Sequence, residues 1–366
     1  MKKLLLAVFS IATTFSLYAQ REVPQERMEQ IYEEVKTPYK YGLAVAPADN
    51  YHKIDCPTVF RQGDKWLMTY VVYNGKGGTD GRGYETWIAE SDNLLEWRTL
   101  GRVLSYRDGK WDCNQRGGFP ALPDMEWGGS YELQTYKGRH WMTYIGGEGT
   151  GYEAVKAPLY VGLAWTKGDI STAHEWESLD KPILSIHDKD AQWWEKLTQY
   201  KSTVYWDKDK TLGAPFVMYY NAGGHHPETN LKGERVGIAL SKDMKTWKRY
   251  SGNPVFAHEA DGTITGDAHI QKMGDVYVMF YFSAFEPSRK YKAFNTFAAS
   301  YDLVNWTDWK GADLIIPSKN YDELFAHKSY VVKHDGVVYH FYCAVNNAEQ
   351  LSLIHISEPT RRSYIS

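Results

Sequence analysis

The stretch from Asp55 to Tyr70 reads Asp-Cys-Pro-Thr-Val-Phe-Arg-Gln-Gly-Asp-Lys-Trp-Leu-Met-Thr-Tyr. It opens with an acidic residue and a short strand-like run, turns at Gly-Asp, and continues as a second strand rich in aromatic and β-branched residues. Close variants return at Gly266 to Tyr281 and at His327 to Tyr342, and looser ones end at Tyr144 and Tyr220. The sequence therefore predicts the same β-hairpin five times.

A second repeat follows each of the first four hairpins. It consists of Ala, any residue, and Ser or Thr, with a Trp further along, and its copies begin at Ala89, Ala164, Ala239 and Ala298. Two hairpins, or about four strands, that recur roughly every 60 to 80 residues are the sequence signature of a β-propeller blade. We therefore predict an all-β fold, a five-bladed β-propeller.

The N-terminal 40 residues precede the first blade. Met1 to Ala19 has two lysines, an apolar run and a small-residue end, which indicates a cleaved secretory signal and a periplasmic or extracellular protein. The apolar run is too short to span a bilayer, so no membrane span is expected. Residues 20–40 form an N-terminal extension, in which Met28, Ile31 and Val35 have helical spacing. Tyr41 to Ala46 is interpreted as an extra strand that closes the ring against the last blade.

The C-terminus departs from the repeat. The fifth blade begins at His327 and reaches Gln350 without its own Ala-x-Ser and Trp. The residues from Leu351 onward resemble the translation of a sequencing-adapter oligonucleotide. We therefore expect the propeller domain to span residues 41–350, residues 351–366 to be a non-native tail, and the last blade to be truncated.

Composition limits the classes of partner. The formal net charge is −3 and the chain has no basic run, which argues against nucleic acid as a partner. The three cysteines are too few for a disulfide framework or a zinc site, although one disulfide stays open. The oligomeric state is not determined by the sequence.

The inner hairpins resemble the superfamily of five-bladed glycoside hydrolases that includes family 43, over Asp55 to Gln350. In that family an Asp-Pro motif supplies the general base, and Asp55-Cys56-Pro57 stands in its place. The Glu of the acid motif corresponds to Asp267, in Gly266-Asp267-Ala268-His269. The carboxylate that tunes the acid is replaced by Lys201, and the channel histidine corresponds to His327.

Family 117 of the same superfamily offers another assignment. The resemblance to it implies that Asp55 is the base, Asp267 the orienting carboxylate and His327 the acid. A histidine next to a carboxylate has a raised pKa, which would let His327 hold a proton near neutral pH. Glu132 and Glu323 are reserve acids.

Four insertions are expected to form the walls of a cleft: Asp80 to Arg82, Glu148 to Glu153, His225 to Glu228, and Glu286 to Arg289. Aromatic side chains in loops can stack on sugar rings. The expected substrate-binding residues are Arg82, Trp111, Lys201, His225, His226, His269 and Lys328. No cofactor is expected to be required, although the resemblance implies that the central channel can hold Ca²⁺ or another divalent ion, with His327 as a metal ligand.

Three functional classes follow from the resemblance. The favoured one is an exported glycosidase that cleaves plant or algal oligosaccharides or polysaccharides by acid/base catalysis. A glycan phosphorylase similar to family 130 and a non-catalytic carbohydrate-binding propeller are the alternatives, the second because Lys201 stands where an Asp is expected. Turnover excludes the binding propeller, and phosphate dependence separates the two enzymes.

Overall fold

The computed structural model describes residues 22–46, 52–74, 81–348 and 351–358, the last range by its backbone. The expected signal at 1–19 lies outside these ranges. Among the described residues, no helix is both long and apolar enough to cross a bilayer.

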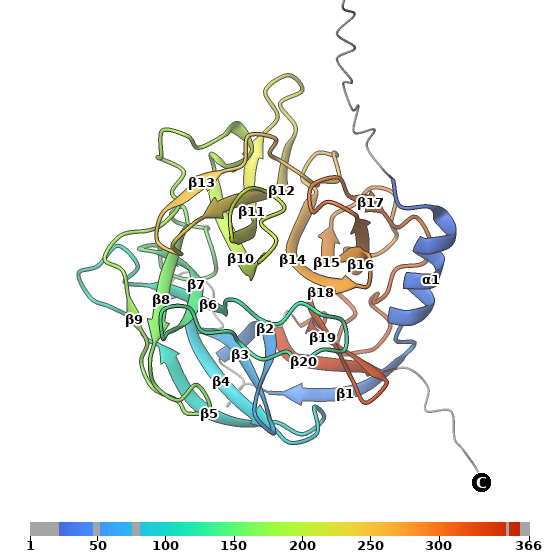
Figure 1. The fold of residues 1–366 in the computed structure, drawn as a ribbon, viewed down its shortest axis with the longest axis horizontal. Helices are drawn as coiled ribbons and strands as arrows, with labels where there is room; N and C mark the ends of the chain where they lie inside the picture. Colours follow the sequence, from blue (N-terminus) through green and yellow to red (C-terminus); the bar gives the residue numbers. More distant parts are fainter. Residues whose placement is uncertain (1–21, 47–51, 75–80, 349–350, 359–366) are drawn as a thin grey trace, which may run out of the picture.

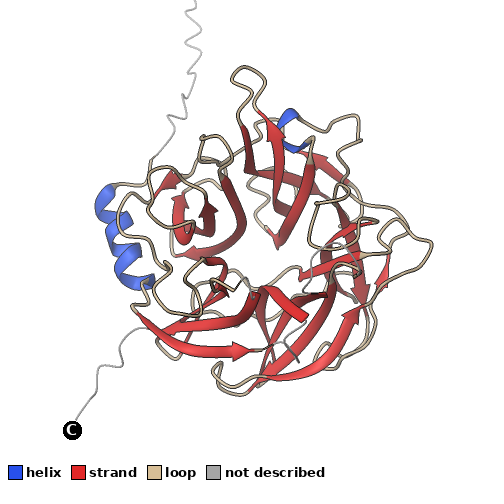
Figure 2. Cartoon of the chain, turned by 180° about the vertical axis from the view of Figure 1, so that it is seen from behind, coloured by secondary structure: helices blue, strands red, loops and turns tan. Residues whose placement is uncertain are grey.

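The described strands form five four-stranded antiparallel sheets, which surround a central axis as the blades of a propeller (Figure 1). The view from behind shows the same radial arrangement (Figure 2). The predicted five-bladed propeller is therefore confirmed. The first four blades, each given from its innermost strand outward, are β2 (His52–Gln62), β3 (Lys65–Asn74), β4 (Glu85–Ser91) and β5 (Arg98–Leu104); β6 (Gln115–Pro120), β7 (His140–Gly147), β8 (Tyr160–Thr166) and β9 (Glu177–Ser178); β10 (Thr198–Trp206), β11 (Phe216–His225), β12 (Lys232–Ser241) and β13 (Trp247–Arg249); and β14 (Ile264–Met273), β15 (Val276–Ala284), β16 (Ala293–Ser300) and β17 (Thr307–Asp308).

The fifth blade joins the two ends of the chain. Its strands are β18 (Phe325–His334), β19 (Val337–Val345), β20 (Leu351–Glu358) and β1 (Tyr39–Val45). The expected closing strand near Tyr41 is confirmed, because β1 pairs with β20 at the outer edge. The expected truncation is not seen in the structure, since β20 occupies the third position of the sheet. That the residues from Leu351 onward are non-native stays a prediction.

The predicted helix is also confirmed. It is α1 (Gln25–Val35), and Met28, Ile31 and Val35 are its buried residues. They pack into one cluster with residues of blades four and five, and Figure 1 shows α1 on the outside of the ring beside β17. The helix thus covers the junction where the ring closes.

The Ala-x-Ser repeat marks the turn from the third to the fourth strand of a blade. In blade three, the Ser241 hydroxyl accepts hydrogen bonds from the backbone N–H groups of Asp243 and Met244. Met244 has a φ of 69°, and its carbonyl accepts a 2.7 Å hydrogen bond from the Trp247 indole. Ser caps the turn and Trp fastens it, which explains why the two recur together.

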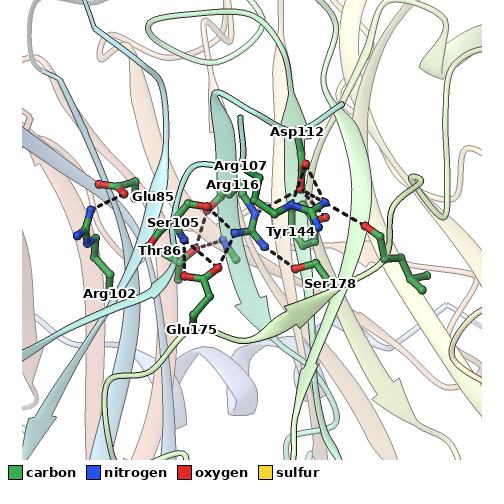
Figure 3. Close-up of polar contacts among 12 residues, drawn as sticks. Glu85, Thr86, Arg102, Ser105, Arg107, Asp112, Arg116, Tyr144, Glu175 and Ser178 are labelled. Atoms are coloured by element: carbon green, nitrogen blue, oxygen red, sulfur yellow. Dashed lines mark hydrogen bonds and ion pairs between the residues drawn. The ribbon is translucent and has the colours of Figure 1, made fainter. Parts of the chain in front are cut away.

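A buried arginine links blades one and two. The Arg116 guanidinium donates to the Ser105 carbonyl, the Glu175 carboxylate and the Ser178 hydroxyl (Figure 3). It also forms an ion pair with Asp112, which is buried and accepts further hydrogen bonds from Arg107 and the Tyr144 hydroxyl. This network lies away from the cavity described below, so its contribution is structural.

Arg116→Met is expected to lower the free energy of unfolding by about 3 kcal/mol, because it leaves buried acceptors without their donor. The loss is held at this level because Arg107 still neutralises Asp112. Arg98→Met is the matched control: Arg98 also forms an ion pair with a glutamate, but its side chain is 73% exposed, and a loss below about 1 kcal/mol is expected. Urea denaturation of both variants gives the comparison, and equal losses would contradict the network.

Candidate active site

Four innermost strands carry a β-bulge at the same place. The pairing register slips between Asp55 and Thr58 in β2, and β10, β14 and β18 slip at equivalent points. Cys56, Asp267 and Lys328 have φ values of 54°, 57° and 52°. Left-handed backbone in non-glycine residues is costly and gathers at functional sites, and bulges redirect side chains. Asp267 therefore corresponds to Cys56 and Lys328, so the expected shared position of Asp55, Asp267 and His327 is wrong by one residue for Asp267.

The bulges of these strands open onto one cavity of about 360 Å³. Residues from all five blades line it, so the cavity lies at the convergence of the inner strands. Its charged and titratable lining residues are Lys53, Tyr73, Tyr152, Glu153, Tyr200, Lys201, Glu234, Asp267, His327 and Lys328, together with Cys56. Asp55 is absent from this lining.

Lys328 is held between two carboxylates. Its Nζ lies 2.6 Å from Asp55 Oδ2 and 2.7 Å from Glu153 Oε1. Glu153 also accepts a 3.1 Å hydrogen bond from the Tyr84 hydroxyl. Asp55 is 0% exposed, and its Oδ1 accepts from the backbone N–H of Cys56. The expectation that Asp55 faces the substrate as the base is therefore wrong, because its carboxylate lies buried behind Lys328, whereas Glu153 lines the cavity.

The ion pair fixes the charges of Asp55 and Lys328. Burial alone would raise the pKa of Asp55, but the charge of Lys328 outweighs it and holds that pKa below its usual value. Burial would lower the pKa of Lys328, yet Asp55 and Glu153 hold it well above the usual value. Both groups are consequently charged over the whole physiological range.

Glu234 is a further carboxylic acid in the cavity and lies on β12. It is partly buried, and its Oε2 accepts a 3.0 Å hydrogen bond from the Asn221 side chain. Burial raises the pKa of Glu234 to about 8, and the charge of Glu153 adds to the rise, while the hydrogen bond from Asn221 opposes it. Glu234 therefore carries a proton at neutral pH, which is the state that a general acid needs.

Asn221 also fixes the bulge of β14. Its Oδ1 accepts a hydrogen bond from the backbone N–H of Asp267. The preceding residue is Gly266, and a Cβ there would approach Asn221 Nδ2 to 2.6 Å. Asp267 lies 3.4 Å from Lys201 Nζ, and burial raises its pKa while Lys201 and Lys328 oppose the rise. Glycine at 266 thus lets the acid and Asp267 share one amide.

His327 lines the cavity but is not charged. Its Nδ1 donates to the Cys343 carbonyl at 3.2 Å, and its ring contacts Phe282 and Phe325. The expected rise of its pKa is wrong in sign: burial lowers the pKa of His327 to about 4, and the opposing effect of Asp55 is smaller. A neutral imidazole cannot serve as the protonated acid at pH 7.

One wall of the cavity is apolar. It is formed by residues of blades four and five, among them Phe282, Phe285 and Phe325. Phe285 is 48% exposed and contacts Phe325 edge-on, with ring centroids 6.0 Å apart. Exposed aromatic surface beside charged groups suits a ligand with one apolar face and several polar groups.

Five of the expected binding residues lie away from the cavity lining. Arg82 pairs with Asp108 and Asn114, and Trp111 stacks on Tyr144. The remaining three are histidines: His225 is exposed, His226 packs on Trp193, and His269 is buried against Tyr330. Lys201 and Lys328 do line the cavity, as expected.

The central channel does not fit a metal ion. Within the described ranges, no group of three or more His, Cys, Asp and Glu residues is arranged to hold one. His327 has its Nδ1 on a carbonyl, and the nearby Asp55 carboxylate is already neutralised by Lys328. The three cysteines are free thiols, so the disulfide left open by the sequence is not formed.

Sequence reasoning missed Glu234 and only approached Glu153. Glu153 lies in the insertion expected to form a cleft wall, where one acidic residue could not be distinguished from solvated loop charge. Glu234 lies on the third strand of blade three, outside the repeat positions used to choose candidates. A signal was present, because Glu234 precedes the apolar run that begins at Val236 and is itself the only acidic residue of that strand segment, Lys232–Ser241.

Comparisons with solved structures place the protein next to two very similar ones. One is described as "Glycoside hydrolase" and the other as a complex of BT0996 with RGII. Each has 92% sequence identity and a TM-score of 0.91, over 94% of this protein and 98% of the other. No family model matches the sequence, and a search of curated proteins finds no match.

A more distant structure shares the fold alone. It is a family 117 glycoside hydrolase of the marine bacterium Zobellia galactanivorans, with 12% identity and a TM-score of 0.59. The match covers 89% of this protein and 91% of the other. The likeness agrees with the expected five-bladed architecture.

Proposed function

Because this chain belongs to the glycoside hydrolases, we propose that it cleaves a glycosidic bond in RGII, a plant pectin, with Glu234 as general acid and Glu153 as the charged carboxylate. Glycosidic cleavage needs one group to protonate the leaving oxygen and a second to attack the anomeric carbon or to activate water. The substrate part of the proposal is supported by the 92% identical protein described in a complex with RGII.

One observation carries the proposal: two glutamates line the same cavity in environments that favour opposite protonation states. Burial and the charge of Glu153 raise the pKa of Glu234 to about 8. Glu153 instead accepts hydrogen bonds from the Lys328 ammonium and the Tyr84 hydroxyl, which favour a charged carboxylate. Pairs of carboxyl groups separated in this way divide the acid and base roles of glycosidases.

The other parts of the cavity have supporting roles in this proposal. Asp55 positions Lys328, and Lys328 orients Glu153. Asn221 orients Glu234. The wall of Phe282, Phe285 and Phe325 packs against the apolar C–H face of a sugar ring.

The test is incubation of the protein with RGII oligosaccharides, with and without inorganic phosphate, followed by chromatography of the released sugars. Release that does not depend on phosphate, and that is lost in Glu234→Gln, supports the proposal. Glu132→Gln is the matched control, because Glu132 is exposed and lies outside the cavity lining. Release that requires phosphate would assign a phosphorylase, and binding without release would assign a carbohydrate-binding propeller.

We also propose that the protein is exported, since residues 1–19 have the pattern of a secretory signal. N-terminal sequencing of protein from the periplasm of an expressing Gram-negative host should then begin at Gln20. An intact Met1 in the membrane fraction would contradict export by cleavage.

A further inference from the structure

Two charged side-chain atoms in the cavity lack hydrogen-bond partners within the described part of the protein. Lys201 lies in β10 and Asp267 in β14, and their side chains are 2% and 5% exposed. Lys201 Nζ and Asp267 Oδ2 lie 3.4 Å apart, and neither atom has a hydrogen-bond partner among the described residues. Both residues line the cavity.

This condition distinguishes the pair from its neighbours. Lys328, Glu234 and His327 each have a hydrogen-bond partner with good geometry. A buried ammonium has three donors and a carboxylate about four acceptor sites, and leaving them unsatisfied is costly. The free donors of Lys201 and the free lone pairs of Asp267 are therefore available to a group bound in the cavity.

The chemistry of the pair selects the kind of group. A lone anion is repelled by Asp267, and a lone cation by Lys201. A hydroxyl both donates and accepts one hydrogen bond or more, and adjacent hydroxyls on a sugar ring lie about as close together as the two charged atoms do. The pair therefore matches a vicinal diol better than a carboxylate or an amine.

We propose that Lys201 and Asp267 bind two adjacent ring hydroxyls of the sugar, one accepting from Lys201 Nζ and the other donating to Asp267 Oδ2. The proposal rests on the glycosidase function in one respect, that the ligand is a sugar. Asn221 contacts both the Asp267 backbone and Glu234, so the diol lies on the sugar unit beside the general acid. The pair thus selects that sugar unit and rejects deoxy analogues, because a missing hydroxyl leaves a buried charge unpaired.

The test measures binding without turnover. Glu234→Gln protein is titrated calorimetrically with the methyl glycosides of the common pentoses and hexoses, and with the 2-deoxy and 3-deoxy analogues of those that bind. Loss of either hydroxyl of the bound diol should weaken binding at least tenfold, since hydrogen bonds to charged groups are involved. In the triple variant that adds Lys201→Met and Asp267→Asn, the parent and deoxy glycosides should bind equally.

A merely structural role for the pair predicts a different pattern. It would weaken the parent and deoxy glycosides by the same factor and leave the penalty for deoxygenation intact. That result would overturn the proposal, as would equal binding of parent and deoxy glycosides before the pair is removed, or no binding of any glycoside. Asp267→Asn alone is the second variant if the triple variant does not fold. Binding that discriminates against deoxy sugars without hydrolysis would retain the diol site and reject the glycosidase.

Discussion

Glu234→Gln reduces kcat/KM by about 10²–10⁴-fold in our account, the range that general acid catalysis contributes. Gln keeps the shape and can still interact with Asn221, but it has no proton to give to the leaving oxygen. The loss should therefore be small for an aryl glycoside with a good leaving group and large for a natural oligosaccharide. Assays of both substrate types measure the difference.

The pH dependence gives a second readout of the same residue. Glu234 is active when protonated, so wild-type kcat/KM should fall as the pH rises through about 8. This basic limb should be absent in Glu234→Gln and present in the control Glu132→Gln. An equal loss for good and poor leaving groups, with the limb retained, would remove Glu234 from the acid role.

Lys328→Met is expected to lower the free energy of unfolding by about 3–5 kcal/mol, the cost of leaving one partner of a buried ion pair without the other. The stranded group is Asp55, which is fully buried. The same change removes the Lys328 donor from Glu153, so kcat should fall as well. Urea denaturation and steady-state kinetics measure the two effects.

Adding Asp55→Asn to Lys328→Met separates the two effects. The double variant contains no unpaired buried charge at this position, so it should regain most of the stability. Its activity should stay low, because Glu153 still lacks its ammonium partner. Recovery of activity together with stability would show that Lys328 matters only for the fold. Complete loss of turnover in Asp55→Asn alone, with stability unchanged, would favour the sequence-based assignment of Asp55 as base.

The architecture could be predicted because it is repeated. Five hairpins and four copies of the Ala-x-Ser turn each report the same unit, and the turn has a local cause in the contacts of Ser241 and Trp247. The helix at Met28, Ile31 and Val35 was likewise readable from its spacing. The four-stranded fifth blade was not, because β20 has none of the repeat signals.

The site was harder to predict because it depends on which side chains face the cavity. A bulge shifts the side-chain direction by one residue, so Asp55 is turned behind Lys328 while Asp267 lines the cavity. The protonation states could not be read from neighbours in the sequence either. Desolvation dominates at His327 and Glu234, and burial is a property of the assembled ring.

The most direct test of the account is the titration of Glu234 itself. In protein labelled with carbon-13 at the glutamate side-chain carboxyl, the signal absent from Glu234→Gln identifies this residue in the NMR spectrum. The account predicts that this signal titrates near pH 8. Titration between about pH 4 and 5, the ordinary range for glutamate, would contradict it, because the two cavity glutamates would then both be charged at neutral pH and neither could donate the proton.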